Sequence, residues 1–156
     1  MDMSEYIATI RWERGGQKFT DEKYSRAHEW RFDGGFTVPA SASPDIVPLP
    51  MSVAEHVDPE EAFVASLSSC HMLFFLAIAA GSGYVIDDYT DEAIGRMEKN
   101  ADGKIVITEV VLRPRVNYSG DTIPDRAKIE SMHHQAHESC FIANSVKTEV
   151  ITQIVS

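Results

Sequence analysis

The longest apolar stretch of the chain lies between residues 58 and 80, and the remaining segments flank it. Asp58 suits a helix N-cap, Pro59 suits the first helical position, and Glu61 can complete a capping box with Asp58. Because no glycine or proline follows until Gly81, the pattern predicts one helix. Its expected length is about 22 residues, or about 33 Å at 1.5 Å per residue.

The second half of this predicted helix is apolar on every side. From Met72 to Ala80 no polar residue interrupts the sequence, which is typical of a helix that is buried all round. A membrane span needs about 20 consecutive apolar residues, and this uninterrupted run is much shorter. We therefore interpret the segment as a central core helix.

The segments on either side of the helix have patterns typical of strands. Turn sequences at 33–35 and 100–103 predict two hairpins, and the proline-rich segment 39–50 predicts a rigid, extended loop. Pro114 predicts an edge or a break in its strand. The strand-like segments cover residues 5–13, 26–38, 84–98, 104–118 and 146–155.

A second helix is predicted between the last two strand segments. Asp121 or Thr122 can cap it, its periodicity runs to about Glu138, and Cys140 lies just past its end. The order of strands, helix, strands, helix and strand predicts a single α+β domain over residues 1–156, with a mostly antiparallel sheet.

Charge and cysteine content narrow the function classes. The chain has 14 basic and 24 acidic residues, for a net charge of −10, which argues against nucleic acid or an anionic membrane as the main partner. The first residues lack a basic region followed by an apolar run, so we expect no secretion signal and a cytoplasmic location. Two cysteines do not form a disulfide framework and better fit a redox, catalytic or metal-binding role.

The chemistry of the two cysteines has several interpretations. Cys70 and Cys140 are both at or near helices, and if they meet, one can react as a thiolate and the other can resolve it. A cysteine in an apolar helix is, however, often only a small core residue. Spacing alone does not bring the two thiols together.

Histidines offer two further alternatives. His133 and His137 are four residues apart and can share a helix face with Cys140 nearby, which is metal-ligand spacing, although a second separated ligand pair is missing. Cysteine–histidine nucleophilic hydrolysis is the other alternative, with His28, His71 or His137 as the base.

Two motifs resemble those of a known family. Residues 58–70, from Asp58 to Cys70, resemble the Asn-Pro-Glu-x-apolar-x-Ala-small-Cys signature of the OsmC/Ohr family, the osmotically inducible and organic hydroperoxide resistance proteins. Residues 136–140 resemble the Ala-His-x-x-Cys sequence around the second cysteine of that family. The chain departs from the pattern at Asp58, where asparagine is usual, and at Phe141, where proline is common.

The resemblance implies a thiol-dependent peroxidase that reduces organic hydroperoxides to alcohols without a metal or organic cofactor. Carried over by position, Cys70 is the peroxidatic cysteine and Cys140 the resolving one. Glu60 and an arginine would organise the site, with Arg26 as the best match and Arg31 in reserve. The implied reductant is a dithiol, often protein-bound dihydrolipoamide.

The resemblance also implies an intertwined homodimer with active sites at the subunit interface. An arginine near Cys70 would favour its thiolate, and Glu60 can hold a guanidinium through a bidentate pair. Ten residues of straight helix separate Glu60 from Cys70 by about 15 Å. We therefore expect a helix break near 66–69 or a loop around Glu60. The alternative function is a non-enzymatic dimeric protein that binds an apolar ligand in the same pocket.

Overall fold

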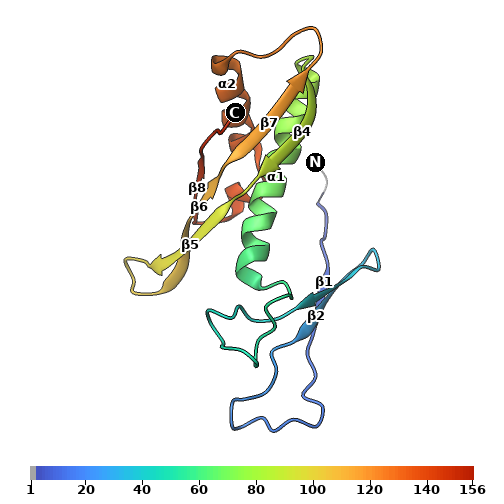
Figure 1. Cartoon of the computed structure of the whole chain (residues 1–156), viewed down its shortest axis with the longest axis vertical. Coiled ribbons are helices and arrows are strands. Elements are labelled where there is room, and N and C mark those ends of the chain that lie inside the picture. The colour runs from blue at the N-terminus through green and yellow to red at the C-terminus, as the bar shows by residue number, and fades with distance from the viewer. Residues whose placement is uncertain (1–2) are drawn as a thin grey trace. The chain divides into compact units, whose positions relative to one another are not determined.

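The computed structural model describes residues 3–156, which form an α+β structure (Figure 1). The described chain divides into two compact units between Ala62 and Phe63. The strands are β1 (Ala8–Arg11), β2 (His28–Phe32), β3 (Thr37–Ala40), β4 (Val85–Asp91), β5 (Ile94–Lys99), β6 (Ile105–Leu112), β7 (Pro114–Ser119) and β8 (Glu149–Thr152). The helices are α1 (Pro59–Gly81), α2 (Arg126–Ser139) and the short 3-10 helix η1 (Ala143–Ser145).

The first unit contains an antiparallel sheet in the order β1-β2-β3. Its register pairs Ile10 with Trp30 and Trp30 with Val38. The predicted hairpin is confirmed, and its turn is closed by a 2.9 Å hydrogen bond from the Gly35 amide to the Phe32 carbonyl. Gly35 has a φ of 94°, a backbone conformation that glycine adopts without steric cost.

Two buried serines hold the proline-rich loop that follows β3. The Ser41 amide donates to the Val57 carbonyl at 3.0 Å, and its hydroxyl accepts from the Val53 amide at 2.9 Å. The Ser52 hydroxyl donates to the Val47 carbonyl at 2.7 Å. Because these buried polar groups are satisfied by the loop's own backbone, the loop is fixed without a large apolar core.

The second unit contains a two-stranded sheet, β4-β7, and a three-stranded sheet, β5-β6-β8, in which only the β6-β8 pair is parallel. The predicted strands 84–98 and 104–118 are each divided in two, which corrects their expected continuity. At the division the Asp91 carboxylate accepts the Arg113 amide at 2.6 Å. Pro114, which follows, confirms the predicted break.

Helix α1 begins as predicted. The Asp58 amide donates to Glu61 Oε1 at 2.9 Å and the Glu61 amide donates to Asp58 Oδ1 at 2.8 Å, so the capping box is closed in both directions. The helix continues without interruption to Gly81. The break expected near 66–69 is therefore absent.

The prediction that α1 is buried on every side is wrong within a single chain. Its buried residues recur at every fourth position, as expected for one helix face, whereas Leu73 on another face is 60% exposed. Length and composition would also let α1 cross a membrane, but its buried face packs on both apolar clusters of the second unit. It is a core helix. The buried residues are Leu67, His71, Phe75 and Ala79.

Helix α2 starts later than predicted. Its N-cap is Asp125, whose carboxylate accepts the Lys128 amide at 2.8 Å, and not Asp121 or Thr122. The proline at position 124 disfavours helical geometry in the residue before it, so the helix begins beyond it. Cys140 is the C-cap, as its position past the helix end predicted.

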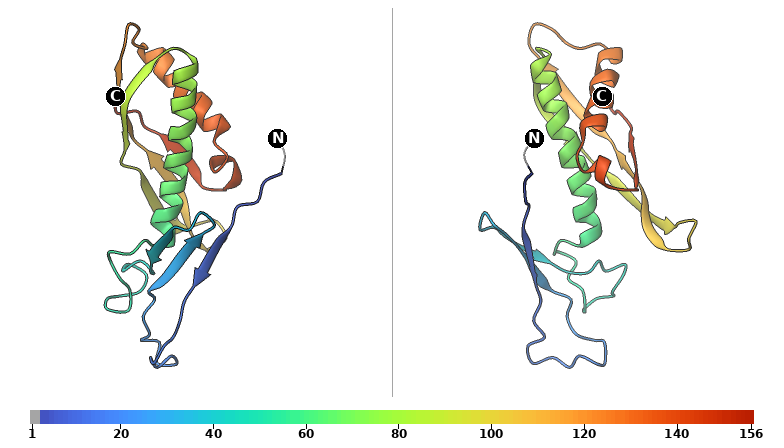
Figure 2. Two further views of the ribbon diagram at one scale, coloured as in Figure 1. Left: turned by 90° about the vertical axis from the view of Figure 1, so that its right-hand side faces the viewer. Right: turned by 180° about the vertical axis from the view of Figure 1, so that it is seen from behind.

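The two helices lie side by side in the second unit (Figure 2). The C-terminal half of α1 and helix α2 share one apolar cluster, to which β7 contributes Val116. On the other side, α1 approaches β5 so closely that a Cβ atom on Gly95 would lie 2.5 Å from Val64 Cγ2. The buried members of the shared cluster are Phe75, Ala79, Val116, Met132 and Ala136.

Candidate redox site

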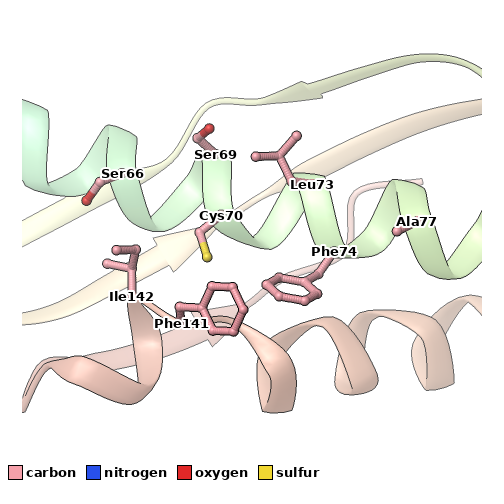
Figure 3. Close-up of a pocket in the computed structure, with 8 residues that line it drawn as sticks. All are labelled: Ser66, Ser69, Cys70, Leu73, Phe74, Ala77, Phe141 and Ile142. Atoms are coloured by element: carbon pink, nitrogen blue, oxygen red, sulfur yellow. The ribbon is translucent and has the colours of Figure 1, made fainter. Parts of the chain in front are cut away.

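A pocket of about 500 Å³ lies between α1 and the segment that follows α2 (Figure 3). The Cys70 sulfur points from α1 toward the segment that carries Phe141 and Ile142. Most of the lining is aliphatic or aromatic, with two serines on the N-terminal side of Cys70. The lining residues are Ser66, Ser69, Cys70, Leu73, Phe74, Ala77, Phe141 and Ile142.

The fold brings the side chains of the two cysteines together. Both are free thiols, and the Cys140 side chain lies within hydrogen-bonding reach of Cys70. Cys70 is partly exposed and lines the pocket, whereas Cys140 is only 1% exposed. A molecule in the pocket therefore contacts Cys70, whereas Cys140 is buried and does not line the pocket.

The environment of Cys140 keeps its thiol protonated. Burial, followed by the hydrogen bond with Cys70, raises the pKa of Cys140 to about 11, although the Ala143 amide, which donates to Cys140 Sγ at 3.4 Å, acts in the opposite direction. A thiol must lose its proton to act as a nucleophile. Cys140 is thus a poor first nucleophile, and its S–H is available to donate to the Cys70 sulfur.

Arg26, the preferred candidate for the active-site arginine, is bound within the first unit. Its guanidinium donates to the Glu22 carbonyl at 3.0 Å and to the Tyr24 carbonyl. The guanidinium carbon also lies 3.7 Å from the centre of the Tyr24 ring, a cation–π arrangement. Carbonyl oxygens and a ring face thus hold Arg26, and among residues 3–156 it has no carboxylate ion-pair partner.

Glu60 and the reserve arginine, Arg31, also belong to the first unit. Glu60 lies in the first turn of α1, where an acidic side chain faces the positive end of the helix dipole. Arg31 forms an exposed pair with Glu29, with 2.8 Å between the charged atoms. The bidentate pair expected between Glu60 and an arginine is not formed among the described residues.

A buried histidine pair beside the cysteines was not anticipated from the sequence. His71 Nε2 lies 3.0 Å from His133 Nδ1, and the two side chains are 1% and 2% exposed. His133 also stacks on Phe75, with ring centres 4.0 Å apart. The sequence does contain one signal that His71 is buried. His71 lies four residues after Leu67 and four before Phe75, so the three residues share one helix face.

Within residues 3–156, no three histidine, cysteine, aspartate or glutamate side chains converge in a way that can hold a metal ion. The alternative built on His133, His137 and Cys140 therefore lacks a ligand set. The pair joins the two helices: His71 follows Cys70 on α1, and His133 lies on α2, whose C-cap is Cys140.

Both histidines of the pair are neutral at neutral pH. Burial, with a smaller effect of His137, lowers the pKa of His71 to about 4, against an opposing effect of Asp91. Burial, followed by His71 and Arg126, lowers the pKa of His133 to about 3. One neutral ring donates to the other, and His71 Nδ1 and His133 Nε2 have no hydrogen-bond partner in the described chain.

We expect this pair to make stability depend on pH. Because folding lowers both pKa values, the unfolded chain binds more protons below about pH 6.5, so the free energy of unfolding falls as the pH drops toward 4. The slope is at most about 1.4 kcal/mol per pH unit for each histidine. Urea unfolding at several pH values between 4.5 and 7.5 measures this slope.

Three variants test whether the histidine pair causes this pH dependence: His71→Leu, His133→Leu and the double substitution. His71→Leu or His133→Leu alone leaves one buried ring without its partner and should cost about 1–3 kcal/mol at pH 7. The double variant removes both polar groups, so it should cost less than the two single effects combined and lose most of the slope. An unchanged slope in the double variant would contradict this explanation.

The fold is that of an α+β protein that carries Cys70 on its core helix and Cys140 at the end of α2. Residues 53–155 match the family model described as OsmC-like protein, and the chain belongs to this OsmC-like family. The structure is similar to that of an OsmC-like protein of unknown function from Vibrio cholerae, with 58% identity, a TM-score of 0.97, and coverage of 98% of this chain and 100% of that one.

More distant solved structures share the fold. An organic hydroperoxide resistance protein from Elizabethkingia anophelis has 17% identity and a TM-score of 0.69, with coverage of 98% of this chain and 95% of that one. The organic hydroperoxide resistance protein OhrB of Bacillus subtilis has 21% identity and a TM-score of 0.64, with coverage of 97% and 98%. No curated protein sequence matches the chain significantly.

Proposed function

We propose that this protein is a thiol-dependent peroxidase that reduces organic hydroperoxides to alcohols. The observation that carries the proposal is the arrangement of the two thiols: Cys70 lines an apolar pocket, and the buried Cys140 lies within hydrogen-bonding reach of Cys70. Membership of the OsmC-like family and the shared fold of hydroperoxide resistance proteins support the same chemistry.

The proposed reaction has two steps at sulfur. The Cys70 thiolate attacks the terminal oxygen of the hydroperoxide, the O–O bond breaks, and the leaving alkoxide takes a proton to become the alcohol, so that Cys70 becomes a sulfenic acid. The Cys140 sulfur then attacks the Cys70 sulfur, the S–O bond breaks, and the Cys140 proton goes to the departing hydroxide, so that water leaves and a disulfide forms. An external dithiol, such as protein-bound dihydrolipoamide, restores both thiols by disulfide exchange.

The apolar lining of the pocket supports an organic hydroperoxide as the substrate. Apolar groups lose contact with water when they bind between Leu73, Phe74 and Ile142, which contributes about 25 cal/mol for each Å² that is buried. Hydrogen peroxide has no apolar group and gains nothing from these contacts. The same pocket favours the alternative function, the binding of an apolar ligand without chemistry.

We also propose that two chains associate and that Arg26 and Glu60 act at Cys70 in the assembled protein. The exposed face of α1 includes Leu73, at 60% exposure, and every residue of β1 is exposed, so both elements present surface to a partner. A guanidinium near Cys70 would favour its thiolate and assist the departing alkoxide.

The first test is the mass of the reduced protein after one equivalent of cumene hydroperoxide under non-reducing conditions. We expect a loss of two hydrogens within seconds and a peptide map with Cys70 linked to Cys140. A second sample receives cumyl alcohol instead of the hydroperoxide and should keep its mass. If both thiols remain reduced, the peroxidase proposal fails and the ligand-binding alternative takes its place.

The arginine assignment gives a separate prediction. Arg26→Ala should slow the reaction of Cys70 with cumene hydroperoxide by about tenfold to a hundredfold, since a positioned cation at a developing oxyanion contributes at least that much. Stopped-flow measurement of the second-order rate constant tests it. Arg31→Ala is the matched control, because Arg31 is exposed and paired with Glu29. A slow Arg31 variant beside a normal Arg26 variant would reverse the assignment.

A further inference from the structure

Phe141 has no role in the two-step chemistry, yet it occupies a prominent position beside it. It directly follows Cys140 in the sequence and lines the pocket that contains Cys70. Its ring is 58% exposed, so the folded core of a single chain does not account for its place. Figure 3 shows its ring on the pocket side, facing Phe74 from the opposite wall.

The two phenylalanine rings form a corner in the pocket. Their centres are 5.0 Å apart and their planes are inclined by 82°, an edge-to-face arrangement. Such a pair presents a ring face on one side and a ring edge on the other, and a third aromatic ring can pack against either in a preferred geometry. A compact aliphatic group buries area there but lacks the ring face and edge that the corner can match.

The corner lies at the right place to select a substituent of the substrate. Phe74 is one helical turn after Cys70 on α1, and residues four apart share a helix face. Phe141 approaches from the segment that carries the second thiol. A hydroperoxide whose reacting oxygen meets the Cys70 sulfur would therefore place its adjacent substituent against these two rings.

We propose that Phe74 and Phe141 form an aromatic specificity wall that selects hydroperoxides carrying an aryl group next to the peroxide. This inference rests on the proposed peroxidase function for its catalytic meaning, but the recognition it describes is a property of the pocket itself. Phe141 is a specificity-determining residue that acts through contact with the substituent and not with the reacting oxygen atoms.

The kinetic test compares two hydroperoxides that differ in one substituent, cumene hydroperoxide and tert-butyl hydroperoxide. The wild-type protein should prefer the aryl substrate in kcat/KM, and Phe141→Ala should lower this ratio by about fivefold to tenfold, the range expected for one aromatic contact. Phe141→Tyr keeps the ring and should retain the ratio. The control is Ile105→Ala, at a residue with the same 58% exposure outside the pocket lining.

A binding test separates this inference from the peroxidase proposal. The reduced protein is titrated with cumyl alcohol and with tert-butanol, which carry the same two substituents but no peroxide, and binding is followed by ligand-detected NMR. Tighter binding of cumyl alcohol that is lost in Phe141→Ala supports the aromatic wall even if no hydroperoxide is reduced. The inference is overturned if the protein is active and the substrate ratio is the same in wild type and Phe141→Ala. It is also overturned if the two alcohols bind with equal affinity relative to the apolar area that each one buries.

Discussion

Replacement of Cys70 by serine is expected to abolish hydroperoxide reduction, with a fall in turnover of at least about a thousandfold. A serine hydroxyl is not ionised near neutral pH and does not form the sulfenic acid on which the second step depends. The measurement is the loss of cumene hydroperoxide in the presence of an excess of dithiol. Turnover at the wild-type rate would end the proposed mechanism.

The control for this variant is its stability. Serine is close to cysteine in size, and Cys70 is only partly buried, so the free energy of unfolding should change little. A variant that is inactive and also unfolded would not test the chemistry, so its circular dichroism and urea midpoint are measured alongside. Cys70→Ala provides a second inactive variant without a hydroxyl group, and both are expected to lose turnover equally.

Cys140→Ser has the second largest expected effect on turnover. It should block only the second step of the reaction, whereas Cys70→Ser blocks the first. The first step should still occur, so each protein molecule releases about one equivalent of alcohol and then stalls as the Cys70 sulfenic acid. A dimedone adduct on the Cys70 peptide, seen by mass spectrometry, identifies this species. Normal multiple turnover with a dithiol, and no adduct, would remove Cys140 from the resolving role.

Burial makes the choice of substitution important at this position. Cys140 is 1% exposed, and a serine hydroxyl that does not keep the hydrogen bond from the Ala143 amide costs about 1–3 kcal/mol. Cys140→Ala avoids the unsatisfied hydroxyl, although it leaves a small cavity. If both variants stall after one equivalent despite their different stabilities, the missing sulfur explains the stall and general destabilisation does not.

Local signals in the sequence identified most elements correctly. The capping box at the start of α1 depends on residues three positions apart, and it forms as predicted because its hydrogen bonds are made within one helical turn. The turn after β2 and the break before Pro114 follow from glycine and proline backbone preferences. Such interactions are local, so the residue order is sufficient to predict them.

The errors arose where distant segments decide the outcome, or where several local signals compete. The predicted strand over 84–98 is divided at Asp91, whose carboxylate accepts the amide of Arg113, a residue between β6 and β7. The burial of α1 was overestimated because a nearly uniform apolar surface does not show which face meets the core. The helix start at Asp125 was missed because two earlier residues are also good caps.

In the candidate site, too, some features follow from the sequence alone and others depend on contacts between distant segments. The sequence alone identified Cys70 and Cys140 as the candidate redox pair and, through the family motifs, the OsmC-like fold. Only the tertiary structure decided that the two thiols are adjacent, that Cys140 is buried and protonated, and that a histidine pair joins their helices. Proximity, burial and pKa depend on what packs around a residue, and that packing is set by contacts between segments far apart in the chain.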